Sequence, residues 1–218
     1  MPTNRYNGRA ADTEPVSAGT LLYRIMRADA TWAANSFNMN PLPLHDPDQG
    51  RFEPTDPKLG GYIYLADSVA GAVAEGVLRN KRIPNSGLVQ RAWLTNKKIA
   101  LLRLDDDVTV ASVYGSRATK LNLDASLLCC GYRGYTRTRT RTTGTQLLLK
   151  TATAYGMRYP CRNHDRLTSL MLITRADRPP RLAIEDEMDI FSDPRGRKLV
   201  FDALYNEWQL HYTGALPA

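Results

Sequence analysis

The sequence predicts an α+β fold with mostly antiparallel strands and a few helices, arranged as a single domain. Candidate strands outnumber candidate helices, and they do not alternate regularly as in a parallel sheet. No internal repeat or convincing linker divides the 218 residues, which are enough to bury a core. Hydrophobic residues make up 43% and charged residues 23%, which is ordinary for a globular protein.

The first part of the chain predicts a leader, two strands and a long loop. Residues 1–18 are polar and lack a secretory apolar segment, so we expect a loose leader on a cytoplasmic protein. Residues 20–26 (TLLYRIM) predict the first strand, and residues 62–65 (YIYL) predict the second. Between them, residues 35–59 hold five prolines and predict an irregular loop, of a length that is often functional.

A helix of small residues is expected after the second strand, with Asp67 or Ser68 as its N-cap. Its apolar face does not include Glu75. One interpretation is an exposed ion pair of Glu75 with Arg79, one turn later, which contributes only a few tenths of a kcal/mol. The other is a carboxylate that faces a ligand.

The rest of the chain predicts further short elements. We expect strands at residues 88–94, 99–104, 157–160, 170–174 and 208–212, and helices at residues 118–130, 145–155 and 196–206.

The net charge and the composition reduce the number of partners and cofactors that we expect. The net charge of +7 favours phosphate-bearing partners, whether nucleic acid, a nucleotide or an acidic protein. No apolar run approaches the ~20 residues of a membrane span, so we expect no membrane partner. The three cysteines and three histidines show no metal-ligand spacing, and we expect no metal.

The run YTRTRTRTT at residues 135–143 has the most unusual composition of the chain. As a strand it would place Arg137, Arg139 and Arg141 on one face, a basic ribbon able to bind phosphates. The alternative is a solvated hairpin or edge strand whose charges prevent aggregation.

Three other places could carry chemistry. Arg24 lies in an apolar strand, where a charge needs an acidic partner or a ligand. Arg51 follows a glycine in the long loop, where it would be exposed or would bind a pyrophosphate bidentately. Residues 159–165 (YPCRNHD) form a polar loop after a short strand, which could line a pocket or be a surface turn.

Together these segments resemble the RES family, named for its Arg, Glu and Ser. LLYRIMR is similar to the family's opening strand and GRFEP to its Gly-Arg-aromatic loop, while IYLADSVAGAVAE resembles its strand–helix element and YGMRYPCRNHDRLTSLMLI its distal Ser-Arg motif. The resemblance runs from about Thr20 to the C-terminus. It places the family's residues at Arg24, Arg51, Tyr64, Glu75, Cys161 and Arg162. Cys161 stands where the family has serine, and a thiol is a weaker hydrogen-bond donor than a hydroxyl.

The resemblance implies an ADP-ribosyltransferase-like fold over residues 19–218 and an NAD+-consuming toxin. Such an enzyme cleaves the nicotinamide–ribose bond by phosphorolysis or hydrolysis, with NAD+ as substrate and no metal. The catalytic residues would be Glu75, which would stabilise the oxocarbenium-like transition state, and Arg24. Arg24 would also bind the pyrophosphate together with Arg51, and Tyr64 would stack on the nicotinamide or ribose. The remaining two positions, Cys161 and Arg162, would contact substrate oxygens.

The same resemblance implies an Xre-type helix-turn-helix antitoxin as partner, and self-association is compatible with the sequence. Two alternatives stay open. Some related members transfer ADP-ribose to a protein, and a different class would be a nucleic-acid-binding module using the run at residues 135–143. No recognition-helix or RNA-binding motif supports direct nucleic-acid binding.

Overall fold

The computed structural model describes residues 6–44, 46, 50–79, 81–123, 128, 134–164, 166–175 and 178–214. Within them, eight strands form one sheet in the order β1-β5-β6-β7-β3-β2-β4-β8. The strands are β1 (Thr13–Val16), β2 (Leu21–Arg27), β3 (Tyr62–Ala66), β4 (Lys97–Leu104), β5 (Val108–Ser112), β6 (Gly156–Pro160), β7 (Thr168–Ile173) and β8 (Leu182–Asp189). All neighbours pair antiparallel except β5 and β6, so the predicted α+β, mostly antiparallel class is confirmed.

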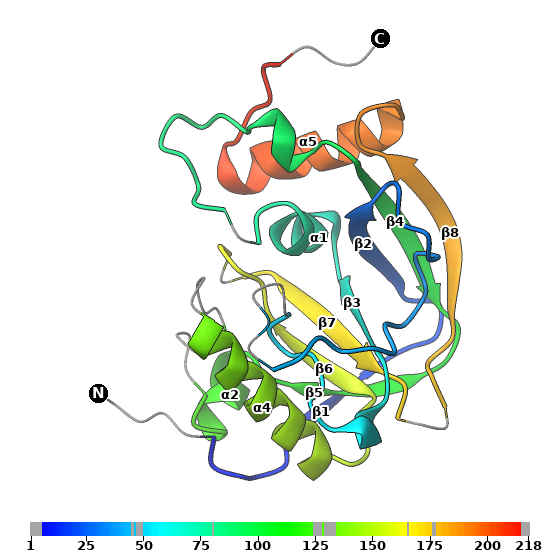
Figure 1. The fold of residues 1–218 in the computed structure, drawn as a ribbon, viewed down its shortest axis with the longest axis vertical. Coiled ribbons are helices and arrows are strands. Elements are labelled where there is room, and N and C mark those ends of the chain that lie inside the picture. Colours follow the sequence, from blue (N-terminus) through cyan, green and yellow to red (C-terminus); the bar gives the residue numbers. More distant parts are fainter. Residues whose placement is uncertain are drawn as a thin grey trace.

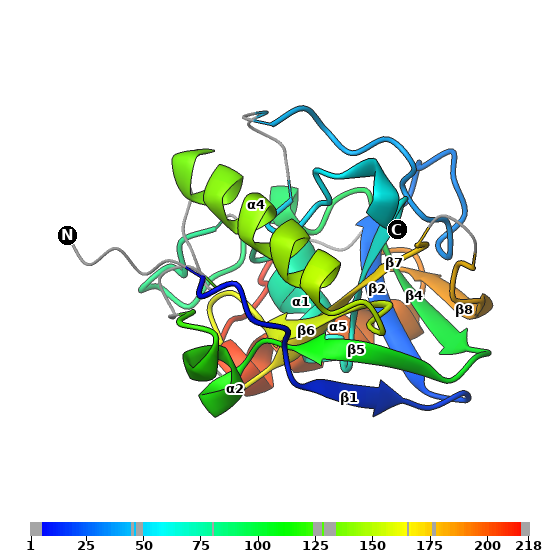
Figure 2. The same ribbon diagram turned by 90° about the horizontal axis from the view of Figure 1, so that it is seen from below.

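Four helices and two short 3-10 turns accompany the described part of the sheet. The helices are α1 (Val69–Gly76), α2 (Gly115–Lys120), α4 (Gly134–Lys150) and α5 (Pro194–Trp208), and the turns are η1 (Pro57–Leu59) and η2 (Arg91–Trp93). Helices α1 and α5 cover β2 and β4, whereas α2 and α4 lie over β5 and β6 (Figures 1 and 2).

The sheet is split in its middle, between β3 and β2. These two strands share only the register pair Tyr23–Ala66, whereas β2 and β4 pair along their length from Leu21–Arg103 to Arg27–Lys97. Beyond the shared pair β2 and β3 diverge (Figure 1). The start of β3 instead pairs with Asn38 of the preceding loop, through an isolated antiparallel bridge to Tyr62.

Side chains that alternate between the two faces of the strands fill three clusters of the hydrophobic core. Ile63 and Leu65 of β3 pack with Leu22 of β2 in a central cluster between the two halves of the sheet. Tyr62 points to the other face of β3, toward the cluster under α2 and α4. Ile99 of β4 joins a third cluster under α1 and α5.

Helix α1 is positioned by its cap and by close packing. The Ser68 side chain accepts a hydrogen bond from the Gly71 N–H at 3.0 Å, which makes Ser68 the N-cap. At its other end, Gly76 lies directly against Ile25 of β2, where a Cβ atom would come within 2.6 Å of the Ile25 Cβ. The small residues thus bring α1 against β2 and place Glu75 beside the split.

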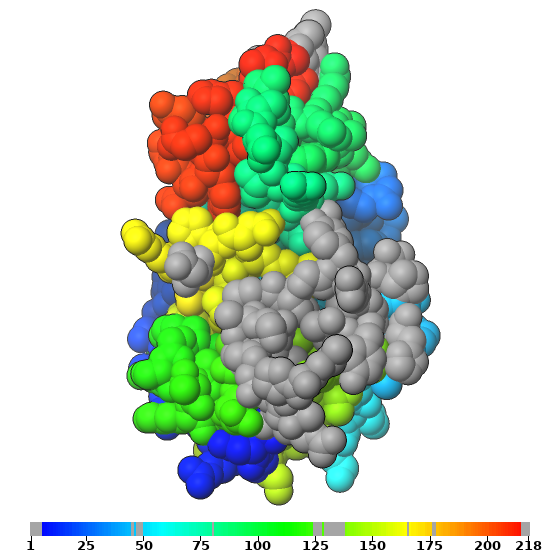
Figure 3. Space-filling view, turned by 90° about the vertical axis from the view of Figure 1, so that its left-hand side faces the viewer, coloured from blue at the N-terminus to red at the C-terminus, as the bar shows by residue number. Residues whose placement is uncertain are grey.

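The C-terminal helix α5 fixes the loop after β6. Its last residue, Trp208, donates from Nε1 to the carbonyl of Asn163 at 3.0 Å, and the Asn163 side chain donates to the carbonyl of Leu78 at 3.0 Å. Figure 3 shows this part of the chain, in yellow, beside the red end of α5 and the green segment that follows α1. The loop that carries Cys161 and Arg162 is therefore attached at both sides.

The strands expected at residues 20–26, 62–65, 99–104, 157–160 and 170–174 and the helix expected at residues 196–206 are confirmed, whereas the helix expected at residues 145–155 overlaps only the end of α4. Residues 88–94 do not form a strand, because Arg91–Trp93 make a 3-10 turn and Leu88 makes only an isolated bridge with His211. Residues 208–212 are not a strand either, since α5 continues to Trp208. Part of the expected loose leader is strand β1, which pairs along β5. Most of the helix expected at residues 118–130 lies outside the described residues.

The run at residues 135–143 is helical and not a strand or hairpin, so the basic ribbon is wrong. It belongs to α4, in which positions 142, 146, 149 and 150 are exposed and most of those between are buried. This spacing of three to four residues is that of a helix with one solvated stripe. In this part of the helix, Thr and Arg occupy buried positions that apolar residues usually fill. Arg141 is buried, whereas its neighbour Thr142 is exposed.

The contact between Gly76 and Ile25 predicts an unusual response to alanine. Alanine normally stabilises a helix relative to glycine by up to ~1 kcal/mol. We expect Gly76→Ala to lower the free energy of unfolding by about 1–3 kcal/mol instead, because the new methyl group must displace α1 from β2. Urea unfolding measures this, with Ala70→Gly reporting the ordinary helix preference. A Gly76→Ala protein as stable as the parent would contradict the close approach.

Candidate active site

A cavity of about 520 Å³ opens at the split between β2 and β3. Strands β2 and β3, helix α1 and the loop before η1 all contribute to its wall. Four of the six predicted site residues line it, namely Arg24, Arg51, Tyr64 and Glu75. The structure therefore brings together residues that are separated by up to 51 positions in the chain.

Glu75 and Arg51 form an ion pair in the wall of this cavity. Arg51 Nη2 donates to Glu75 Oε1, and the two side chains are 2% and 16% exposed. Arg51 lies 24 residues away in sequence, which contradicts the interpretation of Glu75 as half of an exposed pair with Arg79. Glu75 Oε1 also accepts from the backbone N–H of Arg162 at 3.1 Å. Two donors thus fix one oxygen of the carboxylate.

The Arg51 guanidinium is held on several sides. Its Nη1 donates to the carbonyls of Leu128 and, at 3.3 Å, Pro160. Its carbon Cζ lies 4.8 Å from the ring centroid of Tyr159, a cation–π distance. A charge buried to this degree needs such partners, and with them it becomes a rigid support for Glu75.

Arg24 reaches the cavity from β2. Its Nη1 donates to the carbonyls of Ala34 at 2.6 Å and Ser36 at 3.4 Å. Burial lowers the pKa of Arg24 to about 10, so the side chain stays charged at neutral pH. Among the described residues no carboxylate pairs with Arg24, which leaves its remaining N–H groups for a ligand.

Tyr64 connects the cavity to the loop that carries Arg51. Its hydroxyl accepts from the backbone N–H of Phe52 at 2.9 Å. Burial is the main reason why the pKa of Tyr64 lies well above its usual value. The phenol therefore remains protonated, and its hydrogen bond fixes the backbone next to Arg51.

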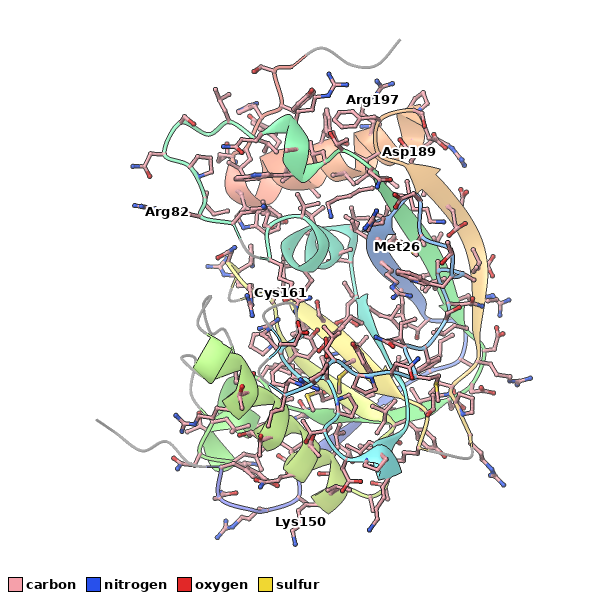
Figure 4. The ribbon with its side chains drawn as sticks, in the orientation of Figure 1. Met26, Arg82, Lys150, Cys161, Asp189 and Arg197 are labelled. Atoms are coloured by element: carbon pink, nitrogen blue, oxygen red, sulfur yellow. The ribbon has the colours of Figure 1, made fainter. Side chains whose placement is uncertain are left out.

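Cys161 and Arg162 do not line the cavity but lie behind its wall. Cys161 is fully buried at the end of β6, and Figure 4 shows it below α1. Its Sγ is 3.0 Å from Ser169 Oγ, and burial raises the pKa of the thiol to about 12. Arg162 is also buried, with Nη1 donating to the carbonyl of Arg79 at 3.0 Å. Its contribution to the site is the backbone N–H that binds Glu75.

Arg141 of α4 holds the loop that presents Arg51. It donates from Nη2 to Leu42 O at 2.7 Å, from Nη1 to Pro43 O at 3.0 Å and from Nε to Glu53 O at 3.2 Å. The Glu53 carboxylate in turn accepts from the backbone N–H of Gly50. The helix that the sequence presented as a basic ribbon is therefore an anchor for the loop of the site.

Sequence reasoning missed several residues around the cavity. Ser169 lies on β7 opposite Tyr159, and this register brings it to Cys161. The cavity is also lined by four further cations and two tryptophans, namely Arg27, Arg79, Lys81, Lys97, Trp32 and Trp93. They come from segments whose pairing the sequence does not reveal.

The described residues contain no group of three His, Cys, Asp or Glu side chains that could hold a metal ion. None of the helices that the structure describes is long and apolar enough to cross a bilayer. The cavity that contains Glu75 is instead surrounded by arginine and lysine, a setting suited to an anionic ligand.

A split, mostly antiparallel sheet with a cation-rich cavity at the split defines an α+β domain with a single candidate site among the described residues. The family model of the RES domain matches residues 21–193, and the chain belongs to the RES family. The structure is similar to one in the crystal structure of the M. tuberculosis MbcT–MbcA toxin–antitoxin complex, with a TM-score of 0.54 and 16% identity. That match covers 85% of this chain and 91% of the other. No curated protein sequence matches this chain.

The anchoring role of Arg141 predicts a local loss of order. Arg141→Met leaves the carbonyls of Leu42, Pro43 and Glu53 without their donor, so we expect a loss of about 2–4 kcal/mol in the free energy of unfolding. Limited proteolysis should then cut within residues 41–54. Arg139→Met, on the same helix, is the control and should change neither measurement. Equal protection of both variants would contradict the anchor.

The burial of Cys161 predicts an unreactive thiol. Because burial raises its pKa to about 12, almost no thiolate exists at pH 8 in the folded protein. We expect iodoacetamide at pH 8 to leave Cys161 unmodified in the native state and to alkylate it fully in urea. Peptide mass analysis separates this residue from Cys129 and Cys130. Rapid native labelling of Cys161 would contradict its placement behind the cavity wall.

Proposed function

We propose that this protein is an NAD+-consuming toxin of a toxin–antitoxin pair, which cleaves the bond between nicotinamide and ribose. The observation that carries the proposal is Glu75, held by Arg51 in the wall of a cavity rich in cations. Membership of the RES family and the likeness to a toxin–antitoxin complex support it.

Glu75 is suited to stabilise a developing positive charge. Arg51 and the Arg162 N–H both bind Oε1, and no described residue bonds Oε2. The carboxylate is thus fixed in orientation while one oxygen remains for the ligand. When the C–N bond breaks, its electron pair leaves with neutral nicotinamide and the ribose carbon becomes oxocarbenium-like. A preorganised carboxylate beside that carbon lowers the barrier.

The two arginines Arg24 and Arg51 have different roles in this proposal. Arg24 lines the cavity and keeps N–H groups for the pyrophosphate of NAD+. Arg51 is almost completely buried and bound by protein acceptors, so we assign it the positioning of Glu75 more than direct phosphate binding. Cys161 and Arg162 act on the substrate only through the wall that they form. Tyr64 supports the Arg51 loop and offers a ring at the cavity.

The reaction ends when an oxygen nucleophile takes the ribose carbon and loses its proton to solvent. Inorganic phosphate gives ADP-ribose-1″-phosphate, and water gives ADP-ribose. The partner would be an antitoxin, as in the complex named for the structural neighbour, and the family resemblance makes an Xre-type protein our choice. A reaction on NAD+ would take place in the cytoplasm.

Direct nucleic-acid binding through residues 135–143 is not proposed. Arg141, one of the three arginines of the supposed ribbon, is buried and bonded to carbonyls. It has no surface for a phosphate backbone.

Glu75→Gln tests the proposal. The amide keeps the size of the side chain but loses its charge, so we expect consumption of NAD+ to fall by about a hundredfold or more, as when one transition-state contact is lost. Nicotinamide release and the mass of the second product, with and without phosphate, are the measurements. Glu185→Gln, an exposed residue paired with Arg103, is the matched control.

Two outcomes of that experiment go against the proposal. A Glu75→Gln enzyme that works at the parent rate would remove Glu75 from the mechanism. A parent protein that consumes NAD+ only when a lysate protein is present, and labels that protein, would make the acceptor a side chain instead of phosphate or water.

A further inference from the structure

Four cations at the cavity have no role in the reaction described above, and Arg27, Lys81 and Lys97 are three of them. Arg27 is the last residue of β2 and Lys97 the first of β4, and the two are directly opposite in register. Side chains of directly opposite residues lie on the same face of the sheet, and like charges there destabilise the pair. Lys81, after α1, lines the same cavity. The fold therefore tolerates a cluster of positive charge at this place.

The charge of this cluster is only partly neutralised. Arg27 is bound by Asp29 through Nε and Nη2, at 2.8 and 2.7 Å. Lys81 Nζ lies 5.7 Å from the ring centroid of Trp93, and among the described residues neither Lys81 nor Lys97 has a carboxylate partner. Burial, followed by the charges of Lys81 and Arg27, lowers the pKa of Lys97. A bound anion would offset the repulsion among these positive charges.

The cluster lies apart from the cations assigned to the pyrophosphate. Residues 24 and 27 of a strand point to opposite faces, so Arg24 and Arg27 enter the cavity from different sides of β2. Ile25, on the same face as Arg27, packs against the core cluster under α1 and α5. The part of the cavity lined by Lys81 and Lys97 therefore lies next to these two helices. The cavity thus offers two separate places for anions.

The positive charge of the cavity wall exceeds the negative charge of one pyrophosphate. Six cations and one carboxylate line the cavity, a net charge of +5, which becomes +4 when Asp29 is counted with Arg27. The pyrophosphate of NAD+ carries two negative charges. The wall is therefore suited to one further phosphate group, whose monoester form is close to a dianion at neutral pH.

An aromatic side chain shows where a base could lie. Trp32 lines the same cavity and is 53% exposed, although tryptophan is usually well buried. An exposed indole ring beside cations is a platform for stacking a nucleobase. A phosphate bound by Arg27 and Lys97 would then lie close to the adenosine end of a dinucleotide.

We propose that Arg27, Lys81 and Lys97 form a phosphomonoester subsite, and that the protein accepts NADP+, whose third phosphate is on the adenosine ribose. The inference rests on the proposed function, since it extends the substrate of the same site. Lysines and an arginine bind such a phosphate by charge-assisted hydrogen bonds. Adenine stacks on Trp32, and the 2′-phosphate meets the cluster.

The test compares NADP+ with NAD+ as substrates of the purified full chain. We expect the parent to consume NADP+ with a kcat/KM at least equal to that for NAD+. Lys97→Met and Lys81→Met should each lower the NADP+ to NAD+ ratio of kcat/KM about tenfold, the effect of one charge-assisted hydrogen bond. Lys98→Met is the matched control, because Lys98 points to the opposite face of β4 and pairs with Glu187, and it should leave the ratio unchanged.

The same experiment shows how the proposal can fail. NADP+ turnover below a hundredth of that for NAD+, or a ratio that Lys97→Met does not change, would overturn it. An effect of Lys97→Met on the dependence of NAD+ turnover on inorganic phosphate, with no effect on the ratio, would assign the cluster to free phosphate and also overturn it.

A binding measurement tests this inference independently of the proposed function. Calorimetry with 2′,5′-ADP and 5′-AMP measures the subsite without any reaction. If the parent consumes neither dinucleotide but binds 2′,5′-ADP at least tenfold more tightly, and Lys97→Met removes that difference, the subsite stands and the proposed reaction fails. Equal affinity for the two probes would overturn the subsite, whether or not NAD+ is consumed.

Discussion

The buried ion pair between Arg51 and Glu75 is the interaction on which the rest of the site depends. Removing one partner of such a pair leaves an uncompensated charge and costs about 3–5 kcal/mol. The pair also joins distant parts of the chain, because Arg51 bonds the Pro160 carbonyl at the end of β6 while Glu75 receives the Arg162 N–H. The loop, α1 and β6 are consequently fixed relative to one another.

The architecture makes this pair possible by opening the sheet. Because β2 and β3 share a single register pair, a space is left between them, and α1 closes one side of it through the contact of Gly76 with Ile25. The loop that supplies Arg51 has little regular structure of its own and is held from outside by Arg141. Met26 of β2 lines the cavity, whereas Cys161 does not, and Figure 4 labels both residues. Glu75 is therefore held by α1, by the backbone of Arg162 and by Arg51, whose own loop is held by Arg141.

The sequence predicted β2, β3, β4, β6 and β7 and missed β1, β5 and β8, of which β1 and β8 are the edge strands. Strands β2, β3 and β7 are rich in apolar and aromatic residues, whereas β8 (LAIEDEMD) is mostly charged and β1 (TEPV) contains proline, both of which suit edge strands. The first half of α4 was predicted as a strand or hairpin because its buried positions there hold Thr and Arg, whereas its second half overlaps the helix predicted at residues 145–155. Arg24, Arg51, Tyr64 and Glu75 were predicted by their order along the chain. Lys97 and Ser169 were not, because only strand register brings them to the site, and Lys81 was not, because it lies in an irregular segment after α1.

The cysteine in place of the family's serine has a smaller consequence than the sequence suggested. The Cys161 side chain is buried against Ser169 Oγ and Gly71, and it does not reach the cavity. What reaches Glu75 from this loop is the backbone N–H of Arg162, a donor that does not change with the side chain before it. The loop keeps its position because Asn163 is bonded to both α5 and the segment after α1. The exchange of oxygen for sulfur therefore affects packing behind the wall, while the bond that orients the carboxylate is preserved.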